Sequence, residues 1–235
     1  MDGVITMEDA RALVGEVKLW PRVRGFLWDF ASQVHESWLE DVLATKNAEN
    51  AKKGKDTLCD LCALCGKERN APRVKRYILD SLGVEPCFHK FPKEDGSRIL
   101  LLDGATLEST AKWLGALACA ESLRRVTSGE VVRGLKSKFR GIYPEVFGYT
   151  AYFNVAAKNA DTAKTPEEIV AIGFKMLFSQ LADLPKSLVA RLKFKLPKSL
   201  CELCVLCGKE ECAVSRSAVL KLFKLKFPEA YKLCC

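Results

Sequence analysis

The cysteines of two matching stretches are the residues of this chain whose type and spacing best suit metal binding. Residues 58–68 read LCDLCALCGKE, and residues 200–210 read LCELCVLCGKE. Two thiols separated by two residues and followed by glycine can fold around a metal ion, and zinc takes four nitrogen or sulfur ligands in a tetrahedron. The candidate ligands are Cys62, Cys65, Cys87 and His89 for a first site, and Cys204, Cys207, Cys212 with Cys234 or Cys235 for a second.

A buried helix explains the same pattern without a metal, because a free cysteine packs as a small hydrophobic side chain. The chain has 11 cysteines, an odd number that does not fit a complete set of disulfides. Residues 1–18 contain four acidic residues and do not resemble a signal peptide, so the thiols are expected to be reduced. We predict neither a metal nor another cofactor, and a zinc-stabilised interaction module stays open as an alternative function.

The sequence contains none of the common catalytic motifs. It has two histidines, His35 and His89, and no nucleophile elbow, phosphate-binding loop, dinucleotide fingerprint or zinc-protease motif. A cysteine nucleophile paired with either histidine is the remaining alternative. We therefore predict that the protein has no catalytic residues and is not an enzyme.

Cations gather in three parts of a chain whose net charge is +8. They are Lys67, Arg69, Arg73, Lys75 and Arg76; then Arg124, Arg125, Arg133, Lys136, Lys138 and Arg140; then the lysine-rich stretch 186–232. A basic balance favours polyanions or anionic membranes as partners, and lysine and arginine neutralise phosphates. Residues 69–73 place a turn and a new helix N-terminus beside two guanidinium groups, which favours anion binding.

Helical periodicity dominates the remainder of the chain. The spacing predicts a long core helix over 106–126, a helix that begins with Thr165 as N-cap, and a last helix over 215–224. Residues 85–104 are expected to be irregular or to form a brief strand. No run of about 20 apolar residues suggests a membrane span. We predict an all-α fold with two lobes.

Four stretches resemble the nucleoproteins of phleboviruses and their relatives. They read WDFA at 28–31 with WLEDVL at 38–43, LCGKERNAPRVKR at 64–76, DGATL at 103–107 with WLGALAC at 113–119, and NADTAKTPEEIV at 159–170. The resemblance implies an N-terminal oligomerisation arm over 1–30, an N-terminal helical lobe over 31–103 and a C-terminal helical lobe over 104–235. It also implies single-stranded RNA contacts from Arg69, Asn70, Arg73, Lys75, Arg76, Arg98 and Lys164.

The function implied by this resemblance is encapsidation of viral genomic RNA, without sequence preference, in a basic cleft. The chain would form homo-oligomers through its arm, within a ribonucleoprotein found in the virion and the host cytoplasm. The viral polymerase is a further candidate partner. A membrane is not the first choice of partner, although a membrane-associated viral matrix protein, using the basic C-terminal stretch, stays open as a second alternative.

Overall fold

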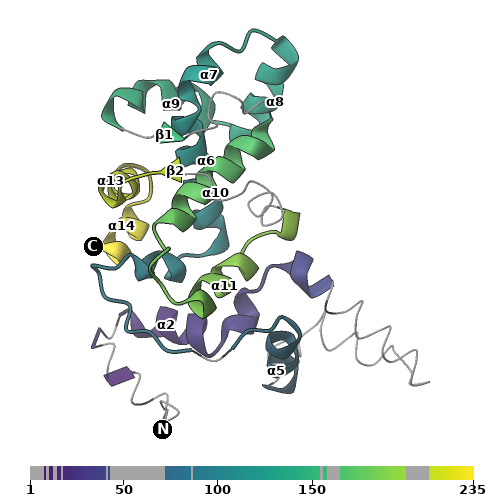
Figure 1. The fold of residues 1–235 in the computed structure, drawn as a ribbon, viewed down its shortest axis with the longest axis vertical. Coiled ribbons are helices and arrows are strands. Elements are labelled where there is room, and N and C mark those ends of the chain that lie inside the picture. The colour runs from purple at the N-terminus through teal and green to yellow at the C-terminus, as the bar shows by residue number, and fades with distance from the viewer. Residues whose placement is uncertain are drawn as a thin grey trace, which may run out of the picture. The chain divides into compact units, whose positions relative to one another are not determined.

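The computed structural model describes residues 8, 11–12, 15–16, 18–40, 42, 72–85, 87–153, 156–157, 165–199 and 212–235. Within these residues the secondary structure is helical apart from one pair of two-residue strands, which confirms the predicted all-α fold (Figure 1). The chain forms two compact units, which we call unit 1 (residues 1–92 and 185–198) and unit 2 (residues 93–184 and 199–235). The assignment of 1–30 to an arm and of 31–103 and 104–235 to lobes stays a prediction.

Unit 1 is built around aromatic side chains. Helix α2 (Trp20–Leu27) begins with a proline in its first turn and is followed by the 3-10 helix η1 (Phe30–Gln33). Phe26 is fully buried and contacts Phe30 and Phe91 edge to face, at centroid distances of 5.6 and 5.9 Å. Helices α5 (Pro72–Ser81) and α11 (Lys186–Phe194) also belong to this unit.

Arg191 ties these elements together from inside unit 1. Its guanidinium donates to the carbonyl oxygens of Phe26 and Leu27, at 2.8 and 2.9 Å, and to that of Glu85 at 2.8 Å. The first two carbonyls end α2 and have no partner within the helix, so the arginine caps it from α11. Burial lowers the pKa of Arg191, opposed by its contact with Cys87. The Arg191 guanidinium keeps its charge at 2% exposure because backbone carbonyl oxygens accept the hydrogen bonds that water would otherwise accept.

Unit 2 is organised by two helices that touch backbone to backbone, α6 (Gly104–Ala118) and α10 (Pro166–Ser179). A Cβ on Gly115 would lie 2.0 Å from the carbonyl oxygen of Ile169, and a Cβ on Gly173 would lie 1.8 Å from that of Ala111. No side chain fits at either position, so the two glycines set how closely the helices pack.

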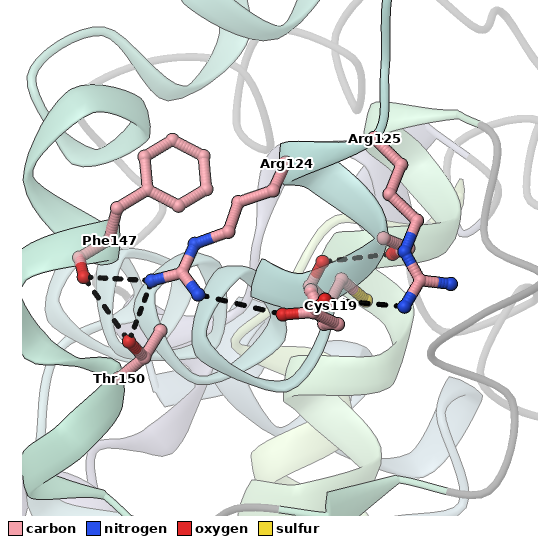
Figure 2. A network of polar contacts seen from close by, with 7 residues as sticks. Cys119, Arg124, Arg125, Phe147 and Thr150 are labelled. Atoms are coloured by element: carbon pink, nitrogen blue, oxygen red, sulfur yellow. Dashed lines mark hydrogen bonds and ion pairs between the residues drawn. The ribbon is translucent and has the colours of Figure 1, made fainter.

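Three shorter helices follow α6 along the chain: α7 (Ala120–Arg124), α8 (Gly129–Phe139) and α9 (Ile142–Tyr149), with the 3-10 helix η4 (Thr150–Tyr152). Figure 2 shows how Arg124 joins α7 to the end of α9. Its guanidinium donates to the carbonyl of Phe147 at 3.3 Å and contacts the hydroxyl of Thr150 at 3.1 Å, while its other end pairs with Glu121. The Phe147 carbonyl, which lies in the last turn of α9, accepts from Arg124 and also from the Thr150 hydroxyl at 3.2 Å.

The C-terminal helices α13 (Arg216–Lys226) and α14 (Pro228–Cys234) complete unit 2. The last helix, predicted over 215–224, is observed as α13, and Ser215 caps it by accepting from the backbone N–H of Ala218. Strands β1 (Ala156–Ala157) and β2 (Cys212–Ala213) pair antiparallel and join two distant parts of the chain. No helix among the described residues is long and apolar enough to cross a membrane.

Two predictions about elements were wrong. The helix expected over 106–126 ends at Ala118 and restarts at Ala120, because Cys119 leaves helical geometry (φ −91°, ψ 6°). The stretch 85–104 holds a buried 3-10 helix, η3 (Ser97–Leu101), where we expected irregular structure or a strand. By contrast, the helix start at Thr165 is confirmed. The Thr165 hydroxyl accepts from the N–H of Glu168, whose carboxylate accepts from the N–H of Thr165.

Candidate binding cleft

The residues predicted to bind RNA are distributed over both units. Helix α5 in unit 1 carries Arg73, Lys75 and Arg76. Lys75 pairs with Asp29 at 2.9 Å, and Arg76 extends into solvent with a loose contact of 3.8 Å to Asp80. The side chain of Arg73 is outside the described part of the structure, as are Arg69, Asn70 and Lys164 altogether.

Arg98 lies in η3 of unit 2 and faces the protein interior. It is 5% exposed and donates to the backbone carbonyl of Leu233 at 3.3 Å. This contact holds η3 against α14, so the described geometry gives the side chain a packing role. The structure does not bring Arg98 and the α5 cations into one described site.

The candidate zinc ligands fall mostly on residues that are not described. Cys62, Cys65, Cys204 and Cys207 lie outside the described ranges, and of Cys212 only the backbone is described. Cys87 is half-buried beside Arg191, and the ring of His89 packs on Phe91 at a centroid distance of 5.2 Å. Among the described residues, no three His, Cys, Asp or Glu side chains form a group that could hold a metal.

A cleft of about 830 Å³ lies in unit 2. Helices α6, α8, α9, α10 and α13 each supply part of its wall. It is lined by Ser109, Lys112, Trp113, Gly134, Ser137, Lys138, Phe139, Arg140, Gly141, Ile142, Glu145, Pro166, Glu167 and Lys226. Four of these side chains are cations and two are carboxylates, so the wall carries an excess of two positive charges.

Ion pairs position three of the four cations. Lys112 pairs with Glu108 along α6 at 2.7 Å, and Lys138 on α8 pairs with Glu167 on α10 at 3.2 Å. Lys226 at the end of α13 donates to the carboxylate of Glu145 on α9. Each ammonium keeps further N–H donors beyond its one carboxylate, so the paired lysines can still bind an anion.

Lys226 is the most enclosed of these cations. Its ammonium lies 4.6 Å from the ring centroids of both Trp113 and Tyr149. Burial lowers the pKa of Lys226, but the hydrogen bonds and charges of Glu145 and Tyr149 outweigh burial and leave the pKa raised. The lysine therefore stays charged at neutral pH and covers one face of Trp113, which is itself 6% exposed.

Arg140 stands apart because no ion pair or hydrogen bond is recorded for its exposed side chain within the described residues. It directly follows α8 and has φ 40°, a backbone region that residues other than glycine rarely adopt. Gly141 comes next and α9 begins at Ile142, so the turn between the helices aims this arginine at the cleft.

The chemistry available in the cleft is anion binding. Its wall offers ammonium and guanidinium groups and two serine hydroxyls, Ser109 and Ser137. The lining residues include no histidine or cysteine. The sequence signalled part of this site, since Lys138 and Arg140 belong to the second basic cluster. Lys226 belongs to the third, lysine-rich stretch, whereas Lys112 on α6 was not singled out from the sequence.

A comparison with known protein families identifies the family to which the chain is related. The family model described as "YOP proteins translocation protein K (YscK)" matches residues 28–234. The chain belongs to the YscK family. This is a family of bacterial type III secretion proteins. Comparisons with curated proteins and with solved structures gave no match.

Membership of the YscK family corrects the predictions that followed from the nucleoprotein resemblance. The resemblance of the four stretches to those nucleoproteins is therefore wrong as a guide to the family of this chain. Encapsidation of viral RNA, the viral polymerase as partner, and the virion and host cytoplasm as location are therefore wrong, since a bacterial secretion protein belongs in bacteria. The alternatives of a zinc module and a viral matrix protein are also not supported.

Proposed function

We propose that this protein is a non-enzymatic component of a bacterial type III secretion apparatus and acts by binding other proteins of that apparatus. The match to the YscK family over residues 28–234 carries this proposal. Helices with rigid, closely packed contacts such as α6 and α10 suit a binding scaffold, and the cleft in unit 2 offers charged groups that can contact a partner.

Deletion of the gene in a bacterium that carries it tests the proposal. We expect the secreted substrates of the type III system to disappear from the culture medium, and a plasmid copy of the gene to restore them. We also expect affinity-tagged protein to retain other components of the apparatus during purification. Normal secretion by the deletion strain would contradict the proposal.

A further inference from the structure

We propose that the cleft in unit 2 binds an acidic segment of a partner protein, with Arg140 as its principal anion contact. This inference rests on the proposed function, because it names the kind of surface that a partner in the apparatus would present. Helix α8, which forms part of the cleft wall, also carries Arg133 and Lys136, which are solvent-exposed and have no ion pair with another described residue.

The charge distribution favours carboxylates that are spaced along a peptide. Glu145 and Glu167 stand among the four cations of the wall. A nucleic-acid backbone carries a charge at every nucleotide and would be repelled at these two positions. A peptide can place its carboxylates at Arg140 and Lys138 and present backbone N–H donors to the two glutamates, so it matches both signs of charge.

The aromatic residue of the cleft argues in the same direction. Single-stranded nucleic acids bind tightly where bases stack on accessible aromatic rings. Trp113 is almost fully buried, and the Lys226 ammonium lies over its ring. Small-molecule sites are mostly apolar with few polar groups, whereas six of the fourteen residues that line this cleft are charged. An acidic protein segment is therefore the occupant that the wall fits best.

Backbone strain at Arg140 gives a second reason to assign it a binding role. A non-glycine residue with positive φ costs stability, and such residues persist where function needs the side chain. Glycine would adopt φ 40° freely at this helix end because it has no Cβ. The protein keeps an exposed guanidinium there instead, at the rim of a cleft with excess positive charge.

The test uses the full-length protein and fluorescence anisotropy. The probe is a fluorescein-labelled synthetic peptide in which glutamate alternates with alanine, and the reference peptide carries glutamine in place of glutamate. We expect the glutamate peptide to bind and the glutamine peptide not to bind, and we expect the affinity to fall as salt screens the charges.

Arg140→Gly separates binding from folding. We expect it to weaken binding of the glutamate peptide by about fivefold, the upper range for one solvent-exposed ion pair. The melting temperature should be unchanged or higher, because glycine removes the strain. Lys224→Ala is the matched control, since it removes one positive charge from an exposed position of α13 outside the lining of the cleft. It should bind the peptide as the unaltered protein does.

Three results would overturn the inference. Equal loss of binding in Arg140→Gly and Lys224→Ala would mean that net charge alone holds the peptide. Unchanged binding by Arg140→Gly would remove the assigned contact. A single-stranded RNA of equal charge that binds as tightly as the peptide would favour a different class of partner.

Complementation separates this inference from the function on which it rests. In the deletion strain, a plasmid encoding Arg140→Gly should restore less secretion than one encoding Lys224→Ala. If deletion blocks secretion and both variants restore it fully, the cleft is not the docking site although the chain is still a secretion component. If deletion leaves secretion intact, the proposed function itself fails.

Discussion

Arg191 and Lys226 are two cations that the fold removes from water in different ways. Arg191 is buried and donates to three backbone carbonyls, so it holds α2 and residue 85 to α11. Lys226 is less enclosed and is held by Glu145 and two aromatic rings. The first cation stabilises unit 1, and the second shapes the cleft of unit 2.

The raised pKa of Lys226 predicts a pH dependence of stability. A lysine whose folded pKa lies above its unfolded value of 10.5 stabilises the protein fully below that pH and loses its contribution as the pH rises through the folded pKa. Lys226→Met should therefore lower the free energy of unfolding by about 1 kcal/mol near neutral pH, a modest value because Glu145 is half exposed.

Urea unfolding of both proteins in reducing buffer measures this effect at about pH 8 and about pH 11, on either side of the ordinary lysine pKa. The difference between the unaltered protein and Lys226→Met should shrink at the higher pH. Lys224→Met serves as the control, because it removes a charge from the same helix without a recorded partner among the described residues. A difference that stays constant with pH would show that Lys226 acts through packing alone.

At the scale of elements, the crossing of α6 and α10 is the most constrained contact of unit 2. Gly115→Ala would place a methyl group 2.0 Å from the Ile169 carbonyl oxygen, and backbone cannot move aside as a flexible side chain would. We expect the free energy of unfolding to fall by about 3 kcal/mol, as for other overpacked interiors. Thermal unfolding followed by circular dichroism measures the change.

Gly134→Ala is the matched control for that substitution. Gly134 lies within α8, and a Cβ there would have no other heavy atom within 4 Å. Alanine should raise stability by up to about 1 kcal/mol, because it is the better helix former. Equal effects of the two substitutions would mean that helix propensity, and not the close approach of α6 to α10, governs Gly115.

The local signals at Thr165 explain why that helix start was predictable from sequence. A cap of threonine, proline and glutamates satisfies its own N–H groups and needs no distant partner. The close approach of Gly115 and Gly173 depends on two helices 50 residues apart that must cross, and a glycine within one helix does not reveal its partner. The break at Cys119 was missed because its neighbours have helical periodicity on both sides.

The cleft was only partly predictable for a similar reason. Lys138 and Arg140 stand in a run of cations that the sequence shows plainly. Lys112 and Lys226 join them because the tertiary fold brings α6 and α13 to α8 and α9, and periodicity says nothing about that meeting. The strained backbone at Arg140 was also not predictable, because the residue types around it do not indicate its φ angle.

At the scale of the whole molecule, the chain passes from unit 1 to unit 2 and back. Residues 185–198 return to unit 1, and residues 199–235 complete unit 2. The returning segment supplies Leu188 and Leu192, both fully buried, together with Arg191. Each unit is therefore assembled from two separated parts of the sequence, and neither is complete in any single stretch.

Truncation after residue 184 should consequently damage both units. The shortened chain lacks α11 from unit 1, and α13 and α14 from unit 2, so we expect it to lose cooperative thermal unfolding. A chain of residues 1–198 retains all of unit 1 and should protect α2 from trypsin, while unit 2 is digested. Equal protection of α2 in the two truncated chains would contradict the role assigned to α11.

The same connectivity imposes an order on synthesis. Ribosomes add roughly 5–20 residues per second in the usual range, so the part of unit 1 that precedes residue 93 waits on the order of 5–20 s before the segment that bears Arg191 is made. During that interval the carbonyls at the end of α2 lack the hydrogen bonds from Arg191, and Phe26 lacks the side chains of residues 185–198 that pack against it. The incomplete unit 1 of the nascent chain is therefore exposed to chaperones and proteases for longer than a unit made from one continuous stretch of sequence.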